Sequence, residues 1–249
     1  MIKEDERLLD GEVHRSPPLS VLAIVYILLF AAGLIVNALL TSGPQNLNPY
    51  NPIDQTQRYY SEYATGIRIS AFFIFASMIP LGLFAVTSVS RLLFHRIHVA
   101  GVHIALFGGV AAAIFLGISG ISTWVLSQTG VASDVGAMRV AQLMNFGAGG
   151  FAHVAALGLF LAGISVPCLF TRLIPGWICW FGLILAGICE IATLSMIFPQ
   201  LSVILPVGRF ASFIWLIAVG FTLPKHRRAK YEMEKAVEAQ RRPLLARTA

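Results

Sequence analysis

The chain has 249 residues, of which 57% are hydrophobic and 12% are charged, and its mean hydropathy is +0.76. Soluble globular domains carry about 25% charged residues, so this composition excludes an ordinary soluble domain and indicates an integral membrane protein. The net charge of +6 fits a membrane protein with basic loops on one side, and no nucleic-acid partner is expected. The three cysteines lack metal-ligand spacing and predict no disulfide framework.

Six apolar runs are long enough to cross a hydrocarbon core about 30 Å thick. In chain order they occupy residues 19–40, 67–89, 99–126, 140–166, 177–198 and 205–223. Signal peptides have an apolar core of only about 7–15 residues, so the longer first run is predicted to remain as a span. The predicted fold is therefore all-α. A polytopic bundle of six transmembrane helices covers residues 19–223, between an N-terminal segment, 1–18, and a basic tail, 224–249.

One long connection, residues 41–66, lies between the first two predicted spans. It begins with Gly, Pro and Asn residues, which favour turns, and its second half contains Tyr59, Tyr60 and Tyr63, which suit a membrane interface. Most other connections are short. Helices that follow one another in sequence are therefore expected to pack side by side in antiparallel orientation.

The distribution of Lys and Arg predicts the orientation of the bundle, because cytoplasmic loops of membrane proteins are rich in basic residues. With both termini in the cytoplasm, that side carries 14 of the 18 basic residues and eight of the 12 acidic residues. Its net charge is then +6, whereas the four basic and four acidic residues of the outer side cancel. An N-in, C-in topology is therefore predicted.

Small residues recur at every fourth position of the third predicted span: Gly101, Ala105, Gly109, Ala113 and Gly117. Lipid is as apolar as leucine, so helices in membranes associate by close packing through such small residues rather than by hydrophobic burial. The fourth span offers a similar series, Ala148, Ala152 and Ala156. The third and fourth helices are predicted to meet along these two ridges.

Four polar residues of the fourth predicted span share one side of the helix. At about 100° per residue, Arg139, Gln142, Asn145 and His153 fall within an arc of about 120°. Polar groups inside a membrane are costly and usually face a partner or water. Two interpretations remain open: a buried seam that hydrogen-bonds neighbouring helices, and one wall of a solvated cavity.

Glu190 is the charged residue of the fifth predicted span and lies eight residues before its outer end. Arg209 lies a few residues inside the sixth span, and Arg68 opens the second span on the same side. Because the fifth and sixth spans form a hairpin, Arg209 is the predicted partner of Glu190. A guanidinium at that position would keep the carboxylate ionised. Whether the pair is a structural link or a titrating switch remains open.

His103 and His153 lie on adjacent predicted spans and suggest a haem or metal site, because paired histidines can ligate iron in a helical bundle. Their depths differ: His103 is one turn from the inner end of its span, whereas His153 is nearer the middle of a long helix. No CxxCH, HExxH, GxSxG or P-loop pattern occurs. No catalytic residue, metal site or cofactor is therefore predicted, with haem on these two histidines as the alternative.

Three stretches are similar to a known family: GIRISAFFIFASMIPLGLFAVTSVSRL, LIPGWICWFGLILAG and LPVGRFASFIWLIAVGFTLPK. The features in common are a Pro-x-Trp before the fifth span and a Gly-Arg-Phe at the start of the sixth, here Pro175, Trp177, Gly208, Arg209 and Phe210. The chain resembles, from residue 19 to residue 225, a bacterial family of six-span integral membrane proteins catalogued as a domain of unknown function. The resemblance implies the bacterial cytoplasmic (inner) membrane and implies no activity.

Two classes of function remain. The first is a non-catalytic membrane protein that binds a small molecule or lipid, or that is a subunit of an assembly with a membrane protein partner. The second is a small-solute or proton-coupled transporter that uses Glu190, Arg209 and the polar face of the fourth span; an intramembrane enzyme or haem protein is third. The candidate intramembrane site comprises Arg68, Arg139, Gln142, Asn145, His153, Glu190 and Arg209.

Overall fold

The computed structural model describes residues 13–41 and 51–226. Within them, six helices are long and apolar enough to cross a membrane, which confirms the predicted all-α six-span fold. In chain order the spans are α2 (Leu19–Leu40), α4 (Ala64–Phe94), α5 (Ala100–Leu126), α6 (Val135–Gly147) with the π-helical turn η1 (Ala148–Ala152) and α7 (His153–Thr171), α8 (Gly176–Ile191) and α9 (Ile204–Thr222). Two 3-10 turns, η2 (Ala192–Met196) and η3 (Pro199–Val203), connect α8 to α9. Most of the predicted N-terminal segment and basic tail lies outside the described residues.

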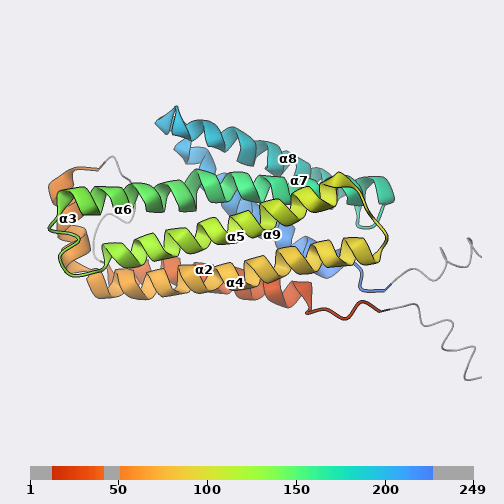
Figure 1. The fold of residues 1–249 in the computed structure, drawn as a ribbon, viewed down its shortest axis with the longest axis horizontal. Helices are drawn as coiled ribbons and strands as arrows, with labels where there is room; N and C mark the ends of the chain where they lie inside the picture. The colour runs from red at the N-terminus through yellow and green to blue at the C-terminus, as the bar shows by residue number, and fades with distance from the viewer. Residues whose placement is uncertain (1–12, 42–50, 227–249) are drawn as a thin grey trace, which may run out of the picture.

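The predicted loop between the first two spans contains a further helix, α3 (Ile53–Glu62). Its backbone is set by Pro52 just before the first turn, and Asp54 in that turn interacts favourably with the positive end of the helix dipole. Tyr59 and Tyr60 are buried in one hydrophobic cluster with residues of α4, α5 and α6. The tyrosines therefore hold α3 across the ends of these longer helices (Figure 1).

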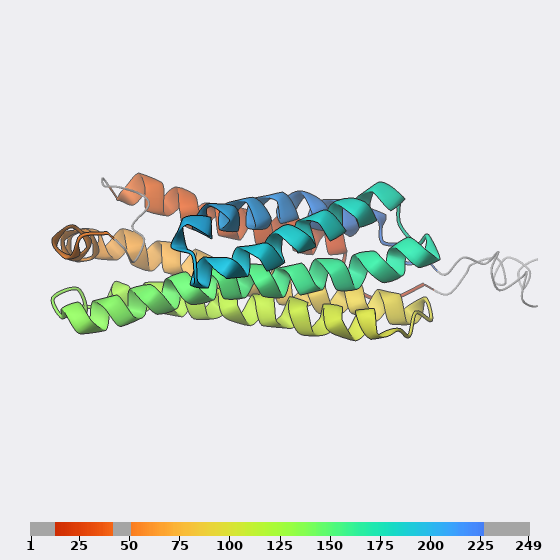
Figure 2. The ribbon, with the colours of Figure 1, turned by 90° about the horizontal axis from the view of Figure 1, so that it is seen from above.

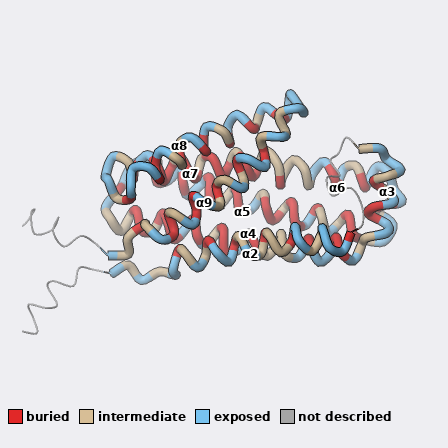
Figure 3. Tube along the Cα trace, turned by 180° about the vertical axis from the view of Figure 1, so that it is seen from behind, coloured by how far each residue is buried: buried red, intermediate tan, exposed pale blue. Residues whose placement is uncertain are grey.

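The six spans close into a ring in which each helix packs against the next in sequence and α9 packs against α2 (Figures 1 and 2). Buried residues lie on the sides of the helices that face the interior (Figure 3). Phe84, Phe160 and Trp215 fill the middle of the ring, and their rings pack edge to face at centroid distances of 6.1 and 5.9 Å. The centre of the bundle is therefore a packed core.

The small residues of α5 allow two helices, α7 and α4, to pack closely against it, whereas only the fourth span was predicted to do so. Gly101 and Ala105 lie against Gly163 of α7, so closely that a Cβ on Gly163 would contact the backbone of α5. Gly109 lies between Ala85 of α4 and Phe160 of α7, and Gly117 faces α4 alone. A step of four residues turns by about 400°, so a ridge with this spacing winds around the helix by about 40° per step. The predicted ridge therefore starts on α7 and ends on α4.

The fourth span is interrupted where the second ridge was predicted. Of its three alanines, Ala156 lies on α7 against α5, whereas Ala148 and Ala152 fall in the π-helical turn η1. Gly150 within this turn has φ −84° and ψ −106°, which departs from helical geometry. A π-helical turn holds an extra residue and so changes the direction in which the following side chains point.

The hairpin of α8 and α9 is shorter than the neighbouring helices. At 1.5 Å per residue, the 19 residues of α9 span about 28 Å and the 31 residues of α4 about 46 Å. The hairpin therefore ends part of the way along the bundle, whereas α4, α5 and α6 continue to the level of α3 (Figures 1 and 2). We call this end of the bundle the α3 end and the opposite one, where both described termini lie, the terminal end.

Arg91 of α4 ties the chain termini together at the terminal end. Its side chain is 1% exposed, and its Nη1 donates to the carbonyl of Leu223 at 2.8 Å. Its Nη2 donates to the carbonyl of Pro17 at 3.1 Å, and its Nε donates to Ser16 Oγ at 3.3 Å. We call this arrangement the terminal clasp, because one side chain joins the segment before α2 to the segment after α9.

His14 lies beside the terminal clasp. Its backbone N–H donates to the carbonyl of Lys225 at 2.9 Å, and its Nε2 is 3.0 Å from Ser90 Oγ. Burial, followed by the nearby charges of Arg91 and His95, lowers the pKa of His14 below its usual 6.5. Docking therefore disfavours protonation of the imidazole.

Attachment of the N-terminal segment is expected to weaken as the pH falls from 7.5 to 5.5. The detached segment takes up a proton on His14 near pH 6.5, whereas the docked segment resists it, so the stabilisation is present above pH 6.5 and is lost below. Hydrogen exchange of residues 13–18, corrected for intrinsic rates, should be faster at pH 5.5. His14→Gln should remove this pH dependence, and equal protection of the unmodified chain at both pH values would contradict the expectation.

Candidate functional site

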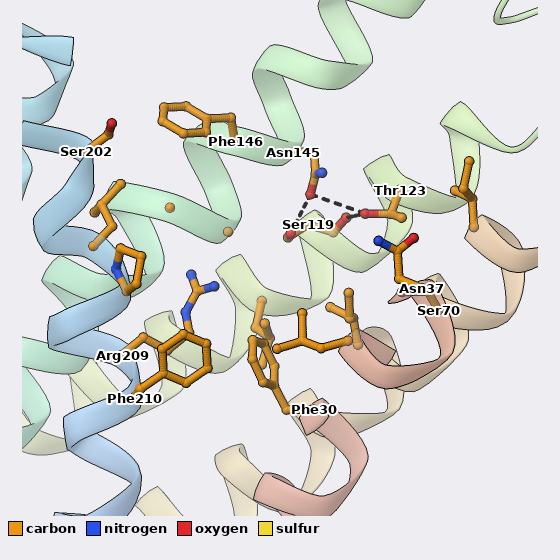
Figure 4. Close-up of a pocket in the computed structure, with 18 of the residues that line it drawn as sticks. Phe30, Asn37, Ser70, Ser119, Thr123, Asn145, Phe146, Ser202, Arg209 and Phe210 are labelled. Atoms are coloured by element: carbon orange, nitrogen blue, oxygen red, sulfur yellow. Dashed lines mark hydrogen bonds between the residues drawn. The ribbon is translucent and has the colours of Figure 1, made fainter. Parts of the chain in front are cut away.

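A cavity of about 400 Å³ lies between the helices, in the half of the bundle towards the α3 end (Figure 4). Its walls come from α2, α4, α5, α6 and η1, with α3 at one end and α9 at the other. It lies inside the bundle, next to the point at which the α8–α9 hairpin ends. Polar side chains that line it include Asn37, Tyr59, Ser70, Ser119, Thr123, Asn145 and Arg209. Apolar ones include Phe30, Leu34, Ile74, Phe146 and Phe210.

Arg209 projects from α9 into this cavity (Figure 4). Its Cζ lies 5.4 Å from the centroid of the Phe30 ring, a cation–π contact. Its Nε is buried without a hydrogen-bond partner, and no carboxylate of the described residues pairs with the guanidinium. An arginine at membrane depth costs roughly 2.5–3.5 kcal/mol on insertion scales, so the guanidinium in this cavity would be stabilised by an anion.

Two amides on the other side of the cavity have their oxygens already engaged. Asn145 Oδ1 accepts hydrogen bonds from Ser119 Oγ at 2.6 Å and from Thr123 Oγ1 at 3.2 Å (Figure 4). Asn37 Oδ1 accepts a hydrogen bond from Tyr59 Oη at 3.0 Å. The NH₂ groups are therefore the parts of both amides that remain available to a ligand. Together with Arg209, they make the cavity rich in donors.

The π-helical turn η1 forms one wall with Gly149 and Gly150. A Cβ on Gly149 would collide with Ser119 Oγ, so glycine is needed for the close approach of η1 to α5. This approach places Asn145, one turn before Gly149, within hydrogen-bond distance of Ser119. π-helical turns occur frequently at functional sites, and here the turn borders the cavity.

The polar face predicted on the fourth span is divided between a seam and the cavity. Arg139 Nη1 donates to Gln142 Oε1 at 3.0 Å, and Arg139 Nη2 donates to the carbonyl of Asn51 at 2.8 Å. These two residues therefore form a seam near α3, and neither lines the cavity. Asn145 does line it, so the predicted face is divided between a hydrogen-bonded seam and the wall of the cavity.

His153 belongs to neither the cavity nor a haem site. It is fully buried at the start of α7, and its Nδ1 donates to the carbonyl of Ala112 at 2.8 Å, because a carbonyl oxygen can only accept. Its Nε2 is buried without a partner. His103 is exposed on α5, nine residues before Ala112 and about 14 Å away along the helix. The two histidines cannot ligate one iron, so the haem hypothesis is wrong.

The predicted pair of Glu190 and Arg209 does not form. Cys189 faces α9, where a Cβ on Gly208 would meet its Sγ. The next residue is turned by about 100°, and the Oε1 of Glu190 lies beside Gly158 of α7. The Glu190 side chain is exposed, Arg209 points into the cavity, and no ion pair joins them in the part of the chain that the structure describes.

Arg68 is also separate from the cavity. Its side chain is exposed, and its Nη2 donates to the carbonyl of Ser127 at 3.2 Å, just beyond the end of α5. The preceding residue, Ile67, lines the cavity, so Arg68 lies on a different face of α4. Of the predicted site residues, the cavity therefore brings together Arg209 and Asn145.

The prediction omitted several other polar residues that line the cavity: Asn37, Tyr59, Ser70, Ser119, Thr123 and Ser202. One signal was present in the sequence: Ser119 and Thr123 are four residues apart and so share a face of an otherwise apolar helix. Tyr59 had no such signal, because its position depends on the unpredicted helix α3.

The six apolar helices define a multi-pass integral membrane protein. No family model, curated protein or solved structure matches the chain. The resemblance to a bacterial six-span family stays a prediction.

Proposed function

We propose that the protein binds a small amphipathic anion in the cavity, without transforming it chemically. The observation that carries the proposal is Arg209, whose guanidinium points into the cavity and has no carboxylate partner among the described residues. Small-molecule sites have volumes of about 300–1,000 Å³ and mostly apolar walls with a few polar groups. The cavity of about 400 Å³ has this character and suits a small ligand.

The chemistry of the lining indicates an acidic head group. The planar guanidinium of Arg209 can donate two parallel hydrogen bonds to a carboxylate or phosphate. The amide NH₂ groups of Asn145 and Asn37 add donors opposite, and the described lining contains no carboxylate that would repel an anion. Phe30, Phe146 and the other apolar side chains suit an alkyl chain or ring.

Binding is favoured over transport because the cavity borders the packed core. Phe84, Phe160 and Trp215 are buried in the middle of the ring, between the cavity and the terminal end. A solute that crossed the membrane through the bundle would have to displace all three aromatic side chains. The predicted coupling pair of a carrier, Glu190 with Arg209, is also absent from the described residues.

The proposal includes a location and an orientation. The excess of basic residues in the segments at the terminal end supports a cytoplasmic position for both termini. The cavity then opens in the outer half of the membrane, and the ligand comes from the outer leaflet or the outer aqueous side. The resemblance to the six-span bacterial family supports the bacterial cytoplasmic membrane.

Three amphiphiles with one alkyl chain separate the parts of this proposal: decanoate, decyl phosphate and decyltrimethylammonium. In nanodiscs of a zwitterionic phospholipid, the two anions should raise the thermal unfolding midpoint with increasing concentration, because a ligand that binds only the folded state stabilises it. The cation should not. Arg209→Gln should weaken decanoate binding about ten-fold or more, since a hydrogen bond to a charged group contributes about 1.5–3 kcal/mol.

Arg58→Gln is the matched control, because Arg58 is an exposed arginine of α3 outside the cavity. It should leave decanoate binding unchanged. Without ligand, Arg209→Gln should keep or raise the unfolding midpoint, since it removes an uncompensated charge. Equal binding of anions and cation, or full decanoate affinity in Arg209→Gln, would rule out the proposed function.

A further inference from the structure

A second concave region lies between α4 and α5, on a face of α4 that does not line the cavity. It is a groove of about 370 Å³. Arg68, Ala71, Phe72 and Phe75 line it from α4, and Gly120, Ile121 and Trp124 line it from α5. We call it the α4–α5 groove. Its aromatic side chains include Phe72 and Trp124, which are 64% and 49% exposed.

The groove has a direction relative to the membrane. Arg68 is in the second turn of α4 and Trp124 in the last turn of α5, so both lie at the α3 end. From Arg68 the lining continues along α4 to Phe75, about 10 Å towards the middle of the bundle. A Cβ on Gly120 would lie 2.8 Å from the backbone nitrogen of Phe75, so the two helices meet closely there. The groove is therefore charged at its membrane-surface end and apolar further in.

Arg68 is placed to bind an anion at the mouth of this groove. One hydrogen bond, from Nη2 to the carbonyl of Ser127, fixes the guanidinium at the end of α5. A guanidinium has five N–H donors, so most of them remain for another acceptor. No carboxylate pairs with Arg68 among the described residues.

We propose that the α4–α5 groove binds an anionic phospholipid of the leaflet at the α3 end. The phosphate contacts Arg68, and one acyl chain lies along Phe72, Phe75 and Ile121. Charge complementarity selects the occupant: the phosphate of a phosphatidylglycerol-type head group keeps its net charge, whereas a choline head group compensates it internally. The indole of Trp124 suits the boundary between head group and chain. This proposal does not depend on ligand binding in the cavity.

Fluorescence quenching by brominated lipids tests the groove directly, because Trp124 lines it. In a Trp177→Phe, Trp180→Phe background, the tryptophans left are Trp124 and the fully buried Trp215. Nanodiscs of phosphatidylcholine contain equal small fractions of dibrominated phosphatidylglycerol or dibrominated phosphatidylcholine. The relative binding constant of the phosphatidylglycerol should be about five-fold higher, which corresponds to about 1 kcal/mol for one basic residue near an anionic lipid.

Arg68→Gln should remove this preference, and Arg68→Lys should retain part of it, which separates loss of charge from damage to the fold. Arg58→Gln, an exposed arginine at the same end, should leave the preference unchanged. Ile121→Phe, which fills the groove, should reduce quenching by both lipids. Equal binding of the two lipids, or an unchanged preference in Arg68→Gln, would overturn the proposal. Absence of quenching by either lipid would do the same and would indicate that a second copy of the chain covers the groove.

Discussion

Replacement of Gly108 by alanine is expected to lower the free energy of unfolding by about 1–3 kcal/mol, the usual cost of overpacking a core. A Cβ at Gly108 would lie 2.6 Å from the backbone nitrogen of Phe160 and 2.7 Å from the carbonyl oxygen of Ala156. Backbone atoms cannot rotate away as the tip of a side chain can, so α5 and α7 would have to separate. Thermal unfolding in detergent micelles measures the effect, which should be visible as a lower midpoint.

Gly187→Ala is the matched control for Gly108→Ala. Both glycines are in helix interiors, but nothing lies within 4 Å of a Cβ built on Gly187. Alanine favours a helix by about 1 kcal/mol over glycine in water, so this variant should unfold at the same or a higher temperature. If both substitutions lowered the midpoint equally, close packing of α5 on α7 would not be what stabilises the bundle.

Arg91→Gln is expected to open the terminal clasp and to lower the free energy of unfolding by about 3 kcal/mol, because one buried and one part-buried hydrogen bond from a charged donor are lost, at about 1.5–3 kcal/mol each. The carbonyls of Leu223 and Pro17 then lose their donors. Hydrogen exchange should rise in residues 13–18 and 223–226, and the unfolding midpoint should fall.

An exposed arginine five residues further on supplies the comparison for Arg91→Gln. Arg96 lies in the turn after α4 and makes no contact with the clasp, so Arg96→Gln should change neither the exchange of the two terminal segments nor the midpoint. Protection of residues 13–18 that survives Arg91→Gln would show that the segments are held by other contacts, such as the β-bridge between Val13 and His226.

The six spans could be predicted because membrane insertion imposes a local requirement. Each span must present about 20 apolar residues in sequence, so length and hydropathy alone locate it. The first predicted span, 19–40, and the helix α2 cover the same residues. Helix α3 was not predicted, because it lies outside the apolar runs and Tyr59 and Tyr60 bury themselves only against helices distant in sequence.

The candidate site was predicted only in part, because the direction in which a side chain points around its helix changes from each residue to the next. Arg209 and Glu190 were placed at suitable depths, yet Glu190 points beside α7 because Cys189 packs against Gly208. Each residue along a helix is turned by about 100° from the one before it, so a difference of one residue decides whether Glu190 faces α7 or Arg209. Hydropathy carries no information on this direction. In the fourth span, η1 breaks the regular spacing on which a single polar face from Arg139 to His153 was based.

The cavity itself has no local signature in the sequence. It exists because α8 and α9 end short of the α3 end while the other spans continue, and because Gly149 allows η1 to approach α5. The relative lengths of the spans and the close approach of η1 to α5 are both relations between helices. They can be recognised only when the spans are placed together in three dimensions. Polar residues such as Asn37 and Ser119 then become neighbours across the bundle.

The short hairpin also has a consequence for the polar group near its end. Together with the 3-10 turn η2, α8 forms a continuous apolar segment of 21 residues, Gly176–Met196, which is long enough to cross a membrane. Glu190 lies six residues before the end of this segment, and its side chain is exposed. Charged side chains within a membrane face a partner or water. The exposed carboxylate therefore marks the end of the hairpin, beside the cavity, as a place that water or lipid head groups reach.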